Sequence, residues 1–160
     1  MLRRLLIALF VAVGVSTPLA AAPKQEVCER QAQQLISAIE AADVDAMWRL
    51  GPALRDDLVG WSKAYPESVP IRFAAGFSLM LEDDLDGALP HLATAYRHSD
   101  YLPLAGYQYA TALRLLGLPL ESLRVTRDLA EHNPDVEQMQ FLYAYNLMDV
   151  QQYDEAYGIL

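Results

Sequence analysis

The sequence predicts an all-α protein built from a helix-turn-helix unit that repeats every 34 residues. Apolar residues recur at three and four spacing along the chain, and no alternating strand pattern extends beyond a few residues. Three successive stretches also repeat at the constant interval of 34: Phe73, Gly76, Leu79, Ala88, Leu92 and Ala95; Tyr107, Ala110, Leu113, Ser122, Thr126 and Leu129; and Phe141, Ala144, Leu147, Ala156 and Leu160. Such a period is typical of helical repeat arrays, whose units bury their apolar faces by stacking on their neighbours.

Residues 1–22 have the layout of a secretory signal peptide, because Arg3 and Arg4 precede a long uncharged apolar run. Small residues follow that run and offer three cleavage sites: Ala20, Ala21 and Ala22. We therefore expect the chain to be exported, in a bacterium to the periplasm. The alternative is an uncleaved segment that anchors the protein in a membrane, because the next charge is Lys24 and the run reaches the length of a spanning helix.

Residues 23–68 predict an N-terminal helical segment that forms a degenerate repeat or a cap. The stretch from Glu26 to Ala42 is amphipathic and predicts one helix. The stretch from Asp43 to Ala64 predicts a broken pair of helices, because Gly51 and Pro52 interrupt its pattern.

Residues 69–160 predict three units of the repeat, at 69–102, 103–136 and 137–160, of which the last is incomplete. Pro90 falls inside the second helix of the first unit, and it is tolerated in the first turn if Asp86 caps that helix. The last helix stops early at Leu160. We expect either a longer parent protein or a partner that supplies the missing cap, and we prefer the first.

In this register the chain resembles the tetratricopeptide repeat family. The resemblance rests on small and apolar residues in the first helices of the three units: Ala75-Gly76 and Leu79, Tyr109-Ala110 and Leu113, Tyr143-Ala144 and Leu147. The turns at 83–88 and 151–156 also match the family, whereas 117–122 departs from it and has Ser122 in place of the usual alanine. The resemblance implies a solenoid of stacked helical hairpins, preceded here by the signal peptide.

The resemblance also implies a partner groove, because first helices line the inner wall in that family. The corresponding positions are Phe73, Phe77, Met80, Tyr107, Thr111, Arg114, Phe141, Tyr145 and Met148. A groove of this composition is apolar and aromatic, and it suits a partner helix or an extended segment. An apolar stripe at helical spacing is equally consistent with a buried core, so both interpretations stand.

The charge of the mature chain excludes several classes of partner. Loss of the leader reduces 12 Lys and Arg residues to 10 against 21 Asp and Glu residues, a formal charge of about −11. Phosphate backbones and anionic lipids would repel this chain, which contains no Lys/Arg cluster. We expect a protein or peptide partner, no nucleic acid, and no membrane insertion after leader removal.

The sequence carries no motif of enzymatic chemistry. It has no nucleophile elbow, phosphate loop or dinucleotide fingerprint, and His91, His98 and His132 lack metal-binding spacing and are expected at the surface or at helix ends. The acids at 82–87 do not continue into a calcium loop, because Ala93 stands where the closing acid is required. The single cysteine, Cys28, is expected to be a small apolar helix residue.

We therefore expect a non-catalytic, exported interaction scaffold without cofactor or metal. The alternative is the N-terminal periplasmic arm of a larger envelope export or assembly protein, in which the repeats recruit cargo.

Overall fold

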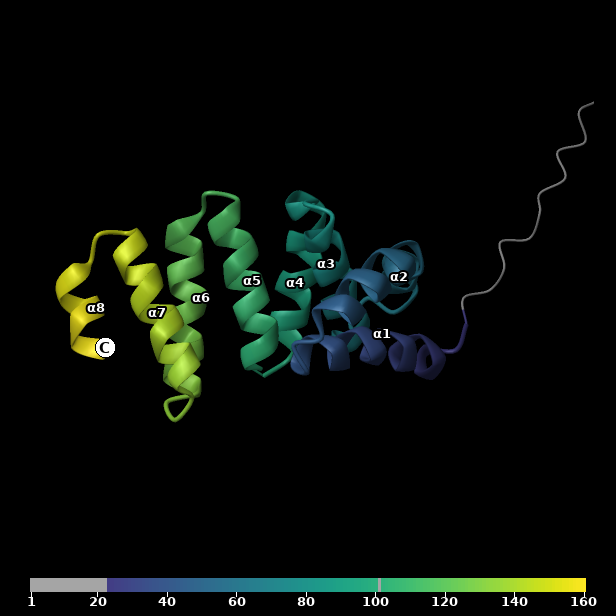
Figure 1. Ribbon diagram of the computed structural model, residues 1–160, viewed down its shortest axis with the longest axis horizontal. Helices are drawn as coiled ribbons and strands as arrows, with labels where there is room; N and C mark the ends of the chain where they lie inside the picture. The colour runs from purple at the N-terminus through teal and green to yellow at the C-terminus, as the bar shows by residue number, and fades with distance from the viewer. Residues whose placement is uncertain (1–22, 101) are drawn as a thin grey trace, which may run out of the picture.

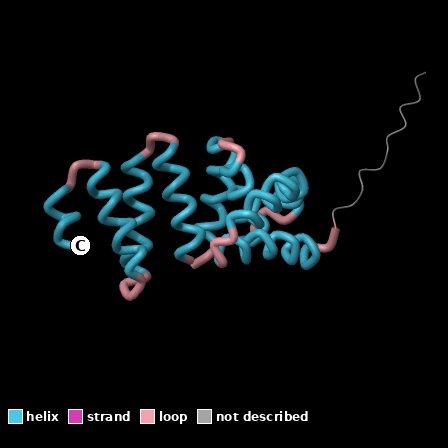
Figure 2. The backbone as a smooth tube through the Cα atoms, in the orientation of Figure 1, coloured by secondary structure: helices cyan, strands magenta, loops and turns pink. Residues whose placement is uncertain are grey.

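The computed structural model describes residues 23–100 and 102–160, and all regular secondary structure in these residues is helical, as predicted (Figure 2). In chain order the helices are α1 (Gln25–Glu40), α2 (Val44–Ala64), α3 (Val69–Leu81), α4 (Leu85–His98), α5 (Pro103–Leu115), α6 (Pro119–His132), α7 (Glu137–Asp149) and α8 (Tyr153–Ile159). They form an elongated row with α1 and α2 at one end and α8 at the other (Figure 1). The predicted signal peptide, residues 1–22, lies outside the described residues.

From α3 onward the helices begin at the interval seen in the sequence. Helices α3, α5 and α7 begin at residues 69, 103 and 137, and helices α4, α6 and α8 begin at residues 85, 119 and 153. Each helix packs against the next one along the chain, so the row consists of successive antiparallel hairpins. This arrangement is consistent with a helical repeat architecture.

The turns inside these hairpins share one backbone geometry. Asp83, Gly117 and Gln151, again 34 residues apart, have φ of 63°, 74° and 64°. In each turn the next backbone N–H donates to a carbonyl five residues earlier, as Asp84 does to Leu79 at 3.0 Å. This left-handed helix ending satisfies the last free carbonyls of the first helix and reverses the chain. A glycine stands at only one of the three positions, so the sequence pattern does not mark the turn by itself.

Helix α4 begins with a different cap from the one expected. The carboxylate of Asp84 accepts a hydrogen bond from the backbone N–H of Gly87 at 3.0 Å, whereas Asp86 lies inside the first turn. The expected cap at Asp86 is therefore wrong, and Pro90 lies in the second turn. The helix continues through Pro90 because the proline removes a single backbone hydrogen bond, while buried residues such as Leu92 hold the helix against α3.

The N-terminal segment confirms one expectation and corrects another. Helix α1 corresponds to the predicted amphipathic helix, but α2 is one continuous helix rather than a broken pair. Pro52 stands inside it, and the carbonyl of Gly51 accepts a hydrogen bond from the Ser78 hydroxyl of α3 at 2.6 Å. Leu58 and Trp61, both buried, pack α2 into the core. This tertiary packing outweighs the local cost of the Gly-Pro pair.

Small residues stand where two helices cross closely. A Cβ on Gly76 of α3 would lie 2.6 Å from Leu92 Cγ and 3.2 Å from the carbonyl oxygen of Ala88, both in α4. The equivalent residues in the later hairpins, Ala110 and Ala144, are also buried. The recurrence of a small residue every 34 positions therefore reflects the approach of the two helices in each hairpin.

Cys28 lies in the core, as predicted for a small apolar residue. Its side chain is fully buried among residues of α1, α2 and α3, including Leu35 and Leu58. Burial raises the pKa of the Cys28 thiol, which therefore stays protonated and unreactive.

Candidate functional site

The nine residues proposed to line a groove differ in exposure: some are buried in the core and others are open to solvent. Phe73 and Phe77 are 3% and 8% exposed, and their rings lie 6.4 Å apart inside the core. Phe77 is buried among residues of α1, α2 and α3, whereas Phe73 is buried against Ile36 of α1 and apolar residues of α4 and α5. The repeat pattern alone did not show this packing. The Phe77 ring is therefore part of the core. The Phe73 ring is also almost fully buried, but it contributes to the wall of a hollow of about 210 Å³ that Ile36 and Ala105 also line. Met80 is half-buried and packs against the same core.

The remaining aromatic residues of the set are exposed and lie on two neighbouring helices. Tyr107 of α5 is 43% exposed, and Phe141 and Tyr145 of α7 are 49% and 67% exposed. Arg114 is exposed, whereas Thr111 and Met148 are half-buried. The Thr111 hydroxyl is used within α5, where it donates to the carbonyl of Tyr107 at 2.8 Å. Thus α5 and α7, not α3, present the open part of the predicted surface.

These exposed residues line a hollow of about 380 Å³ between α5 and α7, which we call the aromatic groove. Its lining residues are Tyr107, Arg114, Gln138, Phe141, Leu142, Tyr145, Asn146 and Asp149. The sequence prediction missed Gln138, Leu142, Asn146 and Asp149. Gln138, Leu142 and Asp149 each lie three or four residues from Phe141 or Tyr145, so the helical period already placed them near that face of α7. Asn146 has no such spacing, and only the packed structure brings it to the hollow.

A buried polar network ties the helices together beneath the aromatic groove. The Ser122 hydroxyl of α6 lies 2.6 Å from Asn146 Oδ1 of α7 and 2.8 Å from the carbonyl oxygen of Ala110 in α5, so its single proton serves two acceptors. The Asn146 amide donates to the carbonyl of Leu142 at 2.9 Å. Asn146 is 1% exposed and Ser122 is fully buried. The serine that departs from the repeat pattern therefore helps to position the wall of the groove.

A second network braces α7 against α6 and α8. The Tyr143 hydroxyl accepts a hydrogen bond from Arg127 Nε at 3.1 Å and donates one to Glu155 Oε1 at 2.7 Å. The Arg127 guanidinium also lies over the Tyr143 ring, 5.7 Å from its centre. Burial and the hydrogen bond to Glu155 raise the pKa of Tyr143. These contacts hold the helix that carries Phe141 and Tyr145 in place.

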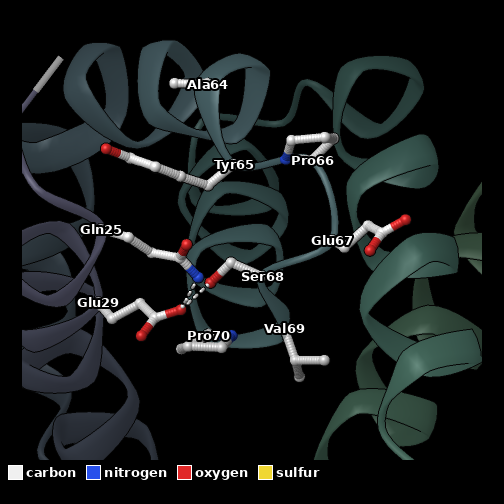
Figure 3. A pocket seen from close by; sticks show the side chains of 9 residues that line it. All are labelled: Gln25, Glu29, Ala64, Tyr65, Pro66, Glu67, Ser68, Val69 and Pro70. Atoms are coloured by element: carbon white, nitrogen blue, oxygen red, sulfur yellow. Dashed lines mark hydrogen bonds between the residues drawn. The ribbon is translucent and has the colours of Figure 1, made fainter.

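A larger and more polar hollow, of about 530 Å³, lies between the start of α1 and the turn from α2 to α3 (Figure 3). At its wall Glu29 accepts hydrogen bonds from Gln25 Nε2 at 2.8 Å and from the Ser68 hydroxyl at 2.7 Å. These hydrogen bonds lower the pKa of Glu29. The carboxylate thus ties α1 to the turn before α3, and its two donors explain its position without a ligand.

Two of the three histidines lie at exposed helix ends, as expected, and the third does not. His98 and His132 are exposed at the ends of α4 and α6, whereas His91 is half-buried in the middle of α4. His91 Nδ1 lies 3.3 Å from Arg72 Nη1 of α3. The guanidinium can only donate, so this contact requires an unprotonated Nδ1. Burial, followed by the charges of Arg72 and Lys63, lowers the pKa of His91.

This arrangement predicts that His91 makes the protein less stable in mild acid. The unfolded chain takes up the proton more readily than the folded chain, so the free energy of unfolding falls as the pH drops from about 6.5 through the lower folded-state pKa. In His91→Gln the loss between about pH 7.5 and pH 5, measured by urea denaturation, should be smaller than in the wild type. The exposed control His98→Gln should lose as much free energy of unfolding over this pH range as the wild type does. If His91→Gln also loses as much as the wild type, His91 is not the source of the acid sensitivity.

Within residues 23–100 and 102–160, no three His, Cys, Asp or Glu side chains lie close enough together to hold a metal ion. No helix in this part of the chain combines the length and the apolar character needed to cross a membrane. No protein-family model and no curated protein matches the sequence.

Proposed function

We propose that this chain is a non-catalytic scaffold that holds a helix or an extended segment of a partner protein in the aromatic groove. The observation that carries the proposal is the joint exposure of Tyr107, Phe141 and Tyr145 around one hollow. Large aromatic side chains gain free energy when they leave water, and exposed apolar patches mark interaction sites. Aromatic side chains in a concave site are also the residues that most often dominate binding energy.

The proposal includes a repeat architecture of the tetratricopeptide type, with units at 69–102, 103–136 and 137–160. It is supported by the 34-residue spacing of the helix starts and by the left-handed turn residues Asp83, Gly117 and Gln151 at the same spacing. Export of the scaffold is part of the proposal and rests on the signal-peptide layout of residues 1–22.

Alanine substitution in the groove should weaken partner capture without unfolding the protein. We expect Phe141→Ala and Tyr107→Ala each to raise the Kd by about tenfold or more, because each removes an aromatic contact from the groove. Because both rings are about half exposed, the melting temperature should change by no more than a few degrees. The measurement is fluorescence anisotropy with peptides selected on the wild-type chain from a random display library.

The matched control is Leu120→Ala, which removes an exposed apolar side chain of α6 outside the groove and should leave the Kd unchanged. Two results would contradict the proposal. One is that selection yields no peptide with saturable binding. The other is that Leu120→Ala weakens binding as much as Phe141→Ala does. A large loss of melting temperature in both groove variants would instead assign Tyr107 and Phe141 to the core.

A further inference from the structure

We propose that the segment held in the aromatic groove is cationic, with Lys or Arg residues flanking its apolar side chains. This inference rests on the proposed function, and it specifies the chemistry of the partner. The geometry of α7, the charge of the chain around it and the position of Arg114 support it.

Helix α7 carries acids at both ends of its exposed aromatic stripe. Glu137, Phe141, Tyr145 and Asp149 follow one another at intervals of four residues, so their side chains form one row along the helix. All four are exposed. The row is about 18 Å long, given the rise of 1.5 Å per residue. A helix or strand lying along this row would place its apolar residues on the two rings and its ends against the two carboxylates.

The segment that carries this row, residues 128–160, is negatively charged. No Lys or Arg follows Arg127, whereas the acids after that position are Asp128, Glu131, Asp135, Glu137, Asp149, Asp154 and Glu155. Such a one-signed region attracts cationic segments and repels anionic ones. The exposed faces of Phe141 and Tyr145 add to this preference, because aromatic faces attract Lys and Arg side chains.

Arg114 makes the two ends of the groove differ in charge. It lines the hollow from α5, and its equivalent position in α7 is Met148, the residue that precedes Asp149. Arg114 and Asp149 both line the hollow, so the positive charge of Arg114 partly offsets the negative charge of Asp149. The position in α5 that corresponds to Glu137 is Pro103, which has no charge. The end of the groove near Glu137 is accordingly the end that should hold the cation of the partner most strongly.

The test uses three synthetic amphipathic peptides with the same apolar residues, whose polar positions carry Lys, Gln or Glu. We expect the Lys peptide to bind the mature chain at least about tenfold more tightly than the Gln peptide at low salt, and the Glu peptide to bind most weakly. Raising the salt to about 1 M should remove most of the difference, because the charges involved are exposed and become screened.

Variants that remove a single charge should change the affinity for the Lys peptide in opposite directions, depending on the charge removed. Glu137→Gln should weaken binding of the Lys peptide several-fold, and Asp149→Asn should weaken it less, because Arg114 already opposes Asp149. Arg114→Gln should strengthen it. None of the three should change binding of the Gln peptide by more than about twofold, since an uncharged ligand does not sense the altered charge. Tyr145→Ala should weaken binding of both peptides, which identifies the groove as the site.

The outcomes separate this inference from the proposed function. Equal binding of the three peptides, or tighter binding of the Gln or Glu peptide, would overturn the cationic partner and leave a peptide-binding scaffold. Binding by none of the three would overturn the cationic partner, and a failed display selection in addition would overturn the proposed function. A dimer in sedimentation velocity that Tyr145→Ala dissolves would show that a second copy of the chain occupies the groove, which would also overturn the inference.

Discussion

Replacing Leu92 with alanine should lower the free energy of unfolding by about 2–5 kcal/mol. Leu92 is fully buried in α4, and its Cγ and Cδ2 atoms would lie only 2.6 and 2.8 Å from a Cβ on Gly76. The side chain thus fills the space left by the glycine at the α3–α4 crossing. Truncation leaves a cavity that the backbone of α3 cannot readily close, so the cost should lie toward the upper end of the range. Chemical denaturation followed by circular dichroism measures it.

Leu115→Ala is the matched control, because it makes the same truncation on α5 at a leucine that is 56% exposed. Its cost should stay within about 0.5 kcal/mol. Similar losses in the two variants would contradict the close crossing of α3 and α4. A small loss in Leu92→Ala alone would show that the α3–α4 interface can collapse around the missing side chain.

Replacing Ser122 with alanine should cost about 1–3 kcal/mol, because it leaves the buried Asn146 Oδ1 without its donor. The hydroxyl also bonds the carbonyl of Ala110, so one substitution loosens contacts among three helices. The exposed control Ser37→Ala on α1 should change stability by no more than about 0.5 kcal/mol. Urea denaturation of the two variants measures the difference.

The double variant Ser122→Ala/Asn146→Ala distinguishes a lost hydrogen bond from lost packing. One repeat earlier, the equivalent positions are Ala88 and Ala112, both fully buried, so an apolar pair is compatible with this crossing. The double variant should lose less stability than the sum of the two single variants, with a coupling of about 0.5–3 kcal/mol. Strict additivity would contradict direct coupling between Ser122 and Asn146.

Much of the fold could be predicted from the sequence, because helix formation depends on residues that are close together in the chain. The period of apolar residues predicted helices, and the structure confirms an all-α chain over the described residues. A small residue recurs at Gly76, Ala110 and Ala144, and all three positions are buried. Cys28 was predicted to be an apolar core residue, and it is fully buried.

The predictions were wrong at two places, the cap of α4 and the continuity of α2. Asp84 and Asp86 both have the side chain of a helix cap, and the observed choice depends on where the left-handed residue Asp83 ends α3. The Gly51-Pro52 pair predicted a break, but burial of Leu58 and Trp61 keeps α2 continuous. For α2, contacts between helices override a local cost of about 3 kcal/mol, whereas for α4 the turn geometry selects between two equally suitable caps.

The candidate site was predicted in part. Helical spacing identified Tyr107, Phe141 and Tyr145 as a possible groove, and these residues line an exposed hollow. The same spacing selected Phe73 and Phe77, which neighbouring helices bury. An amphipathic pattern shows that a face is apolar, but it does not show whether a neighbouring helix or a partner covers that face.

Residue types and their spacing along the chain are enough to predict the helices, their 34-residue interval and the acidic charge, because each of these depends on neighbours in the sequence. The packing of the helices is needed to show which aromatic residues stay exposed and which asparagine pairs with Ser122, and the turn geometry shows which aspartate caps α4. Asn146 lies 24 residues from Ser122 along the chain, and no local pattern relates the two. Contacts of this kind exist only once the helices have packed, because a buried polar group must find its partner among the residues that folding brings beside it.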